Sequence, residues 1–129
     1  MKIEHVAIWC RDLEAMRSFY VQYFNAVSND LYINEKKQYR SYFLSFESGT
    51  RLELMQMSTV AENLNGVGTQ YFGLNHFAFS TGSKNRVDEL TLRLSEAGFK
   101  VVGEPRTTGD GYYESVVLDP ENNRIEITV

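Results

Sequence analysis

One short pattern occurs twice in this chain, and the repeat limits the folds that the chain can adopt. Each copy begins with a strand-like segment that carries a histidine, and His5 and His76 are the only histidines. Each copy ends with a segment in which a glutamate, Glu53 or Glu126, lies between large apolar residues. The histidines are 71 residues apart and the glutamates 73. Such a steady offset indicates an internal duplication.

The residues between these landmarks predict a β-α-β-β-β order in both copies. Alternating apolar residues predict strands, and capping residues followed by apolar residues at helical spacing predict helices. In the first copy, Asp12 caps a helix that ends near Asn25, and the strands cover 3–10, 31–33, 40–47 and 51–57. In the second copy, Ser83 caps a helix that ends at Gly98, and the strands cover 74–80, 100–102, 112–118 and 124–129. Residues 105–111 are expected to form a turn-rich loop.

We predict one α+β domain over residues 1–129, large enough for a sizeable core. Module one covers 1–57, a linker covers 58–73, and module two covers 74–129. The net charge of −4 gives no indication of a nucleic acid or an anionic membrane as partner. The single cysteine, Cys10, cannot form an internal disulfide, and no apolar run approaches the ~20 residues that span a bilayer. A cytoplasmic protein is therefore expected.

The four repeated residues are candidate ligands of one metal ion. A lone strand histidine is more often structural, and a glutamate that alternates with leucine or isoleucine usually faces water. Here, however, both pairs fall at equivalent positions of a duplicated unit, and such units usually pack about a pseudo-twofold axis. We therefore expect one divalent ion to be bound by His5, Glu53, His76 and Glu126. Two imidazoles and two carboxylates suit nickel or zinc, and also cobalt, manganese or iron, and they leave two octahedral positions for water or substrate.

The same residues resemble the vicinal oxygen chelate superfamily, which includes glyoxalase I, methylmalonyl-CoA epimerase, extradiol dioxygenases and the fosfomycin and bleomycin resistance proteins. The matching segments are His5-Val-Ala-Ile, Leu52-Glu53-Leu54, Asn75-His76-Phe-Ala-Phe and Asp119-Pro120-Glu-Asn-Asn-Arg-Ile-Glu126. The resemblance covers nearly the whole chain and implies that the two modules form a cup-shaped mixed sheet. It also implies a homodimer, in which the metal site combines modules of one chain or of two chains.

The presence of Glu53 makes the chain similar to glyoxalase I in particular. The dioxygenases of this superfamily lack a ligand at that position, and the epimerase tends to have glutamine there. The resemblance therefore implies a metal-dependent carbon–sulfur lyase of the lactoylglutathione lyase kind, active in methylglyoxal detoxification. Such an enzyme isomerises the hemithioacetal of methylglyoxal and a thiol to a hydroxyacyl thioester. Glu126 is the expected base, with Glu53 as its symmetric counterpart, and the metal stabilises the enediolate.

Two positions depart from the pattern of bacterial glyoxalase I. Trp9 stands where that enzyme has an arginine that helps to hold glutathione, and Met57 stands where it has an asparagine. Both changes remove polar contacts, so glutathione is disfavoured as the thiol. Trp9, Met55 and Tyr112 are candidate substrate-binding residues. Trp9 and Met55 share a predicted strand face with the ligands, although core positions are an alternative, and Tyr112 lies in a glycine-rich segment that forms either a lid or an ordinary hairpin.

Two other functions are alternatives. One is an epimerase or isomerase of the same superfamily that acts on another oxygen-chelating substrate. The other is a drug-binding resistance protein without catalytic activity. The second alternative needs no metal, and the complete ligand set argues against it.

Overall fold

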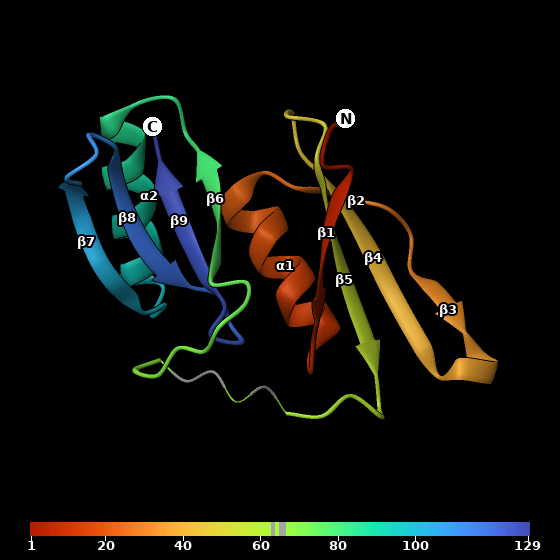
Figure 1. Cartoon of the computed structure of the whole chain (residues 1–129). Coiled ribbons are helices and arrows are strands. Elements are labelled where there is room, and N and C mark those ends of the chain that lie inside the picture. Colours follow the sequence, from red (N-terminus) through yellow and green to blue (C-terminus); the bar gives the residue numbers. More distant parts are fainter. Residues whose placement is uncertain (63, 65–66) are drawn as a thin grey trace. The chain divides into compact units, whose positions relative to one another are not determined.

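The structure is a computed structural model that describes all residues except 63, 65 and 66. The chain divides into two compact units, Met1–Asn63 and Leu64–Val129. The predicted linker, 58–73, contains the three residues that lie outside the described ones. Each unit combines one helix of 12 or 13 residues with its own mixed sheet (Figure 1). The prediction of an α+β fold built from two modules is therefore confirmed.

The first unit contains a five-stranded sheet with one parallel pair of strands. Its elements are β1 (His5–Trp9), α1 (Leu13–Phe24), β2 (Val27–Ser28), β3 (Tyr32–Asn34), the 3-10 helix η1 (Glu35–Lys37), β4 (Tyr39–Ser45) and β5 (Arg51–Met57). The strand order is β1-β5-β4-β2, and β3 also pairs with β4. Only β1 and β5 run parallel, while the other pairs described are antiparallel. The parallel pairing brings the histidine strand beside the glutamate strand.

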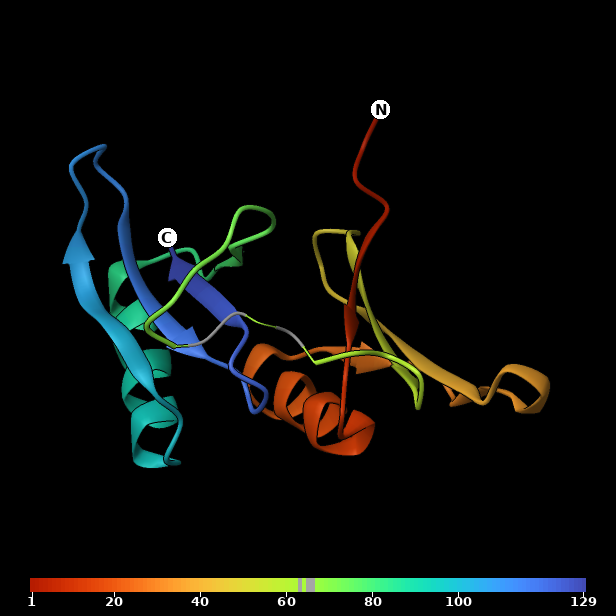
Figure 2. The same ribbon diagram turned by 60° about the horizontal axis from the view of Figure 1, so that its bottom comes forward.

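The second unit repeats this plan with four strands. Its elements are β6 (His76–Ser80), α2 (Lys84–Glu96), β7 (Val101–Thr107), β8 (Tyr113–Leu118) and β9 (Arg124–Thr128). The order β6-β9-β8-β7 again places the histidine strand parallel to the last strand (Figure 1). The rotated view shows the three blue strands β7, β8 and β9 of this sheet (Figure 2). The two sheets therefore share a topology, which is the structural counterpart of the sequence repeat.

The helices begin at the residues that the sequence predicts. The Asp12 carboxylate accepts a hydrogen bond from the backbone N–H of Ala15 at 2.9 Å, and the Ser83 hydroxyl accepts one from that of Arg86 at 3.4 Å. Such caps satisfy N–H groups that have no partner within the helix. α1 ends at Asn25, which has a φ of 54°, a left-handed conformation that asparagine tolerates better than most residues.

The core of each unit lies between its helix and one face of its sheet. α1 packs against β4 and β5, and α2 packs against β7, β8 and β9. The buried residues of the two glutamate strands are Leu52 and Leu54 in β5, and Ile125 and Ile127 in β9. Burial of each such side chain contributes about 1.5–3 kcal/mol. Since successive side chains point to opposite faces, this burial turns the intervening glutamates to the face away from the helix.

A tyrosine ties each helix to its sheet. In the first unit the Tyr42 hydroxyl donates to the Glu14 carboxylate at 2.7 Å, and in the second the Tyr113 hydroxyl donates to Asp88 at 2.7 Å. The hydrogen bond to Glu14, followed by burial, raises the pKa of Tyr42. The bond to Asp88 raises the pKa of Tyr113 in the same way. Both pKa values rise because an ionised phenol would lose the bond and face a negative carboxylate.

The structure corrects two details of the predicted elements. Val27–Ser28 forms a short strand that the sequence pattern did not indicate, because two residues are too few to alternate visibly. The strand predicted at 100–102 extends through Thr107, into the expected loop. Pro105 is accommodated there because β7 is an edge strand whose pairing with β8 shifts register between Gly103 and Arg106. No helix in the described part of the chain is long and apolar enough to cross a membrane.

Candidate metal-binding pairs

Strand register gives the two units the same local arrangement. His5 lies opposite Arg51 and Ala7 opposite Glu53, while His76 lies opposite Arg124 and Ala78 opposite Glu126. Paired residues on neighbouring strands point to the same face of a sheet, and so do residues two apart on one strand. Each histidine therefore shares a face with one glutamate. The small alanine between them leaves room for the two side chains to approach each other.

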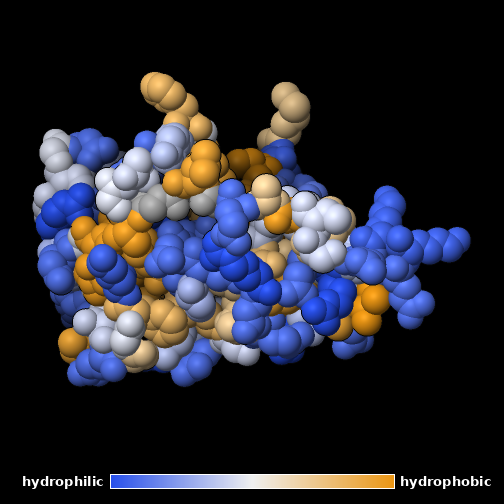
Figure 3. Space-filling view, turned by 90° about the horizontal axis from the view of Figure 1, so that it is seen from below, coloured by the Kyte–Doolittle hydropathy of each residue, from blue (hydrophilic) through white to orange (hydrophobic). Residues whose placement is uncertain are grey.

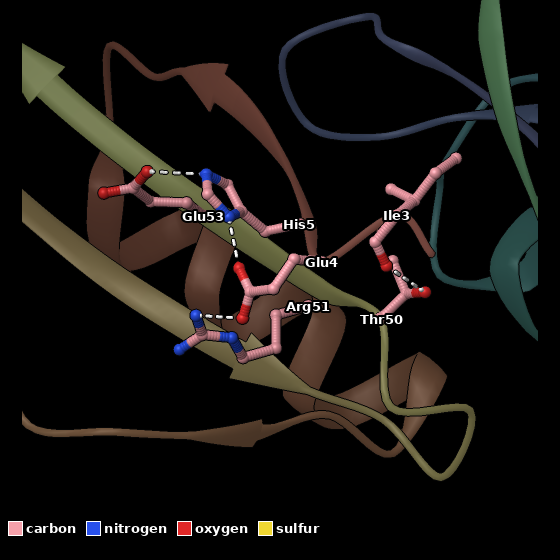
Figure 4. Close-up of polar contacts among 6 residues, drawn as sticks. All are labelled: Ile3, Glu4, His5, Thr50, Arg51 and Glu53. Carbon is pink, nitrogen blue, oxygen red and sulfur yellow. Dashed lines mark hydrogen bonds and ion pairs between the residues drawn. The ribbon is translucent and has the colours of Figure 1, made fainter. Parts of the chain in front are cut away.

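In the first unit, His5 points its Nε2 atom toward Glu53. This nitrogen is 3.9 Å from Glu53 Oε2, and the side chains are 41% and 14% exposed (Figure 4). The other ring nitrogen, Nδ1, is 2.5 Å from the carboxylate of Glu4. An ionised carboxylate only accepts hydrogen bonds, so Nδ1 is the donor to Glu4 and Nε2 is the ring nitrogen that faces Glu53. This is the ring orientation that a metal-binding histidine needs.

Glu4 is held in place by an arginine as well as by the histidine. Its second oxygen accepts a hydrogen bond from Arg51, whose guanidinium stacks 4.2 Å from the centre of the Phe43 ring. The hydrogen bond from His5 and the positive Arg51 together lower the pKa of Glu4. Figure 4 shows the resulting series of contacts from Arg51 through Glu4 and His5 to Glu53. Glu4 is thus a negatively charged group that hydrogen-bonds to Nδ1 of His5 and orients the ring.

Glu53 has a hydrogen bond of its own. The Tyr39 hydroxyl donates to Glu53 Oε1 at 2.9 Å, so the two carboxylate oxygens have different neighbours. Burial, together with the bond to Glu53, raises the pKa of Tyr39. Tyr39 therefore stays a neutral donor at ordinary pH, and Glu53 is positioned by a group that cannot compete with it for a cation.

In the second unit, the equivalent pair lies closer together and has different support. His76 Nε2 is 3.1 Å from Glu126 Oε1, with side chains 39% and 21% exposed. His76 Nδ1 is 2.9 Å from Asn75 Oδ1, and the Asn75 amide nitrogen donates to Gln70 Oε1 at 2.5 Å. Asn75 thus presents its amide oxygen to the histidine. Nδ1 is again the protonated nitrogen, and Nε2 faces the carboxylate.

Each pair has the chemistry of half a metal site. A lone pair on Nε2 and a carboxylate oxygen repel each other at 3.1 Å unless a proton or a cation lies between them. Two ligand atoms that each lie about 2.1 Å from one metal ion, at right angles to each other, are about 3 Å apart. The distance between Nε2 and the carboxylate oxygen matches this value closely in the second pair and within about 1 Å in the first pair. The two pairs belong to different units. Within the described residues, no group of three or more His, Cys, Asp or Glu side chains is gathered around one point.

The candidate substrate-binding residues occupy different surroundings. Trp9 and Met55 are opposite each other in register and share the face of His5 and Glu53, and the Trp9 side chain is exposed. In the second unit, Tyr112 is exposed in the turn before β8, where its carbonyl accepts from the Thr108 N–H at 2.8 Å. Residues 107–113 therefore form an ordinary hairpin turn. Apolar residues reach the surface among charged ones in the space-filling view (Figure 3).

Sequence reasoning did not assign roles to three residues that support the pairs. Glu4 and Asn75 each precede a histidine, so a repeat of an acceptor before the histidine was present in the sequence. Tyr39 had no comparable signal, because its contact with Glu53 depends on the pairing of β4 with β5. An arginine also lies two positions before each glutamate. Arg51 bonds Glu4, whereas Arg124 donates to the carbonyl of Val67 at 2.8 Å.

A comparison with protein families gives a match over nearly the whole chain. The model of the Glyoxalase/Bleomycin resistance protein/Dioxygenase superfamily matches residues 2–127. A sequence relative, the uncharacterized protein YqjT of Bacillus subtilis (strain 168), is 38% identical over 58 residues. That alignment covers 43% of this chain and 45% of the relative, so the chain matches less than half the length of that protein.

Solved structures give a consistent picture of the fold. A possible glyoxalase from Bacillus cereus is 26% identical, with a TM-score of 0.74 and coverage of 100% of this chain and 99% of the other. A glyoxylase/bleomycin resistance protein/dioxygenase domain from Frankia sp. EAN1pec is 19% identical, with a TM-score of 0.82 and coverage of 100% and 97%. Glyoxalase I from Zea mays is 21% identical, with a TM-score of 0.79 and coverage of 98% of this chain and 44% of the maize protein. The latter two likenesses establish a shared fold.

Proposed function

The chain belongs to the Glyoxalase/Bleomycin resistance protein/Dioxygenase superfamily, and from this membership we propose that it is a metal-dependent, glyoxalase I-like lyase. The observation that supports the proposal is the His–Glu pair that occurs in each unit at the same strand register. We propose that one divalent ion, nickel or zinc before cobalt, manganese or iron, is held by His5, Glu53, His76 and Glu126. The two pairs come from one chain or from two chains of a homodimer.

The proposed reaction isomerises a hemithioacetal of methylglyoxal to a hydroxyacyl thioester. The ion would supply Lewis acid chemistry to two neighbouring substrate oxygens. Glu126 takes the proton from the carbon that bears sulfur and returns it to the neighbouring carbon, while the hydroxyl proton passes from the first oxygen to the second. Substrate and product have the same composition, so the reaction consumes no oxidant or reductant. Glu53 is the symmetric counterpart of this base.

The thiol part of the substrate is proposed to be less polar than glutathione. Trp9 and Met55 present an apolar surface on the same face as Glu53, and Met57 continues it along β5. Trp9 is the only tryptophan, so its fluorescence reports on ligands at this surface. We expect a saturable fluorescence change with the hemithioacetal of an aromatic thiol and a weaker one with that of glutathione. Tyr112 is a further substrate contact in this proposal. We also propose that the protein is a homodimer and that it is located in the cytoplasm.

The activity is tested by adding methylglyoxal and a series of thiols to metal-loaded protein and following thioester formation. Wild-type protein is expected to form the thioester, and Glu126→Gln is expected to lose most of this activity. Thioester formation with none of the thiols would exclude the lyase.

The second candidate function is an epimerase or isomerase that acts on another oxygen-chelating substrate. It is favoured by Trp9 and Met57, which stand where bacterial glyoxalase I has residues that contact glutathione. Exchange of a substrate C–H proton with deuterated water, without thioester formation, would identify it.

A further inference from the structure

We propose that Tyr39 is a positioning residue that fixes Glu53 as a permanent ligand of the metal and so leaves Glu126 as the carboxylate that moves. This inference rests on the proposed function, because it assigns different roles to two residues of that site. The contact that supports it is the hydrogen bond from the Tyr39 hydroxyl to Glu53 Oε1 at 2.9 Å.

The geometry around Glu53 separates its two oxygens. Oε1 receives the Tyr39 hydroxyl, and Oε2 is the oxygen that faces His5 Nε2 at 3.9 Å. Glu53 can therefore bind a cation through Oε2 while Oε1 remains bonded to Tyr39. Release of Glu53 from the ion would also strain or break the bond to Tyr39. A second neighbour thus holds this carboxylate in one orientation, which is the usual effect of hydrogen bonds to metal ligands.

Tyr39 is itself held by its surroundings. Its ring lies edge-on to Trp9, with centroids 6.1 Å apart, and at a similar distance of 6.2 Å from Tyr32. With its ring and its hydroxyl both constrained, Tyr39 is a fixed donor and costs little conformational entropy when it positions Glu53.

In the described part of the second unit this bond is absent, although a tyrosine lies at the equivalent place. Phe43 is opposite Glu53 and Val116 is opposite Glu126, so Tyr112, four residues before Val116, corresponds to Tyr39. Tyr112 is 60% exposed. Among the described residues, His76 is the one side chain in polar contact with Glu126. Glu126 can therefore leave a ligand position without breaking a second bond, as a base must.

The test compares the metal affinity of two phenylalanine variants. Tyr39→Phe keeps the aromatic ring and removes only the hydroxyl, and it is expected to weaken binding of Zn²⁺ or Ni²⁺ by about 10-fold, within the range seen for partners of metal ligands. Tyr32→Phe is the matched control, since it removes a hydroxyl from the same aromatic group without a bond to Glu53, and its affinity should equal that of wild type. Affinities are measured by competition with a chromophoric chelator, and circular dichroism checks that each variant folds.

A double-mutant cycle shows whether Tyr39 acts through Glu53. In a Glu53→Gln background, the additional change Tyr39→Phe should no longer weaken metal binding, because the bond it removes has lost its charged acceptor. The inference would be overturned, and the proposed function left standing, by either of two results. One is equal metal affinity of wild type and Tyr39→Phe, and the other is an undiminished effect of Tyr39→Phe in the Glu53→Gln background. Weaker binding by Tyr39→Phe in a protein that forms no thioester would support the inference and overturn only the proposed reaction. A wild type that binds no metal would overturn both.

Discussion

The two His–Glu pairs have the same register but different surroundings. The pair of the first unit is supported by charged or fixed groups: a carboxylate behind His5, an arginine behind that carboxylate and a phenol on Glu53. The pair of the second unit has a neutral amide behind His76, and Glu126 is more exposed than Glu53. The histidine and the glutamate thus occupy the same register positions in both units, while the groups that contact them differ. In the site proposed above, the first pair would be the fixed half and the second pair the mobile half.

The largest expected difference between the halves is in catalysis. Glu126→Gln should lower kcat by about 1000-fold, because an amide cannot accept the substrate proton and a positioned base contributes 10²–10⁴-fold. Glu53→Gln should lower kcat by less than about 10-fold at saturating metal, since the residue serves as a ligand. Both constants are measured as initial rates of thioester formation. Equal losses in the two variants would remove the distinction between the halves.

The supports of the two histidines should also differ in their effect on metal affinity. Glu4→Ala is expected to weaken metal binding by about 10–100-fold, and Asn75→Ala by less, because a charged acceptor makes the stronger hydrogen bond. Glu62→Ala is the control, since it removes an equally negative, exposed side chain of the first unit that pairs with Arg11. Affinity is measured by chelator competition. An effect of Asn75→Ala that exceeds that of Glu4→Ala would reverse the comparison.

The sequence predicted the fold because its signals were repeated and local. Alternation in β1, β5, β6 and β9, the caps Asp12 and Ser83, and the steady offset between modules each describe neighbouring residues. The four candidate ligands were also named from the repeat, but the parallel pairing that places each histidine beside one glutamate came from the structure. The contacts of Tyr39 and Arg124 were not predictable, because they depend on how strands and loops far apart in the chain come together. Similarly, nothing in the local pattern of 100–107 showed that an edge strand could include Pro105.

The smallest effect is expected from the tyrosine bonds between helix and sheet. Their raised pKa values mean that the folded protein keeps phenol protons at a pH where the unfolded chain releases them, so stability falls as the pH rises above about 10. Tyr42→Phe should flatten this fall more than Tyr113→Phe, because Tyr42 is buried and Tyr113 is more exposed. Urea unfolding at about pH 8 and about pH 10.5 measures the difference. Identical pH dependence of stability in wild type and Tyr42→Phe would show that the bond between Tyr42 and Glu14 does not contribute to the loss of stability at high pH.

The central claim is that the two pairs bind one ion together, and the metal content of the purified protein tests it most directly. After incubation with Zn²⁺ or Ni²⁺ and removal of excess metal, elemental analysis should find about one ion per chain in wild type. His5→Ala and His76→Ala should each lose nearly all of it, because each variant breaks the same site. Absence of stoichiometric metal in wild type, or full retention in either variant, would contradict the claim.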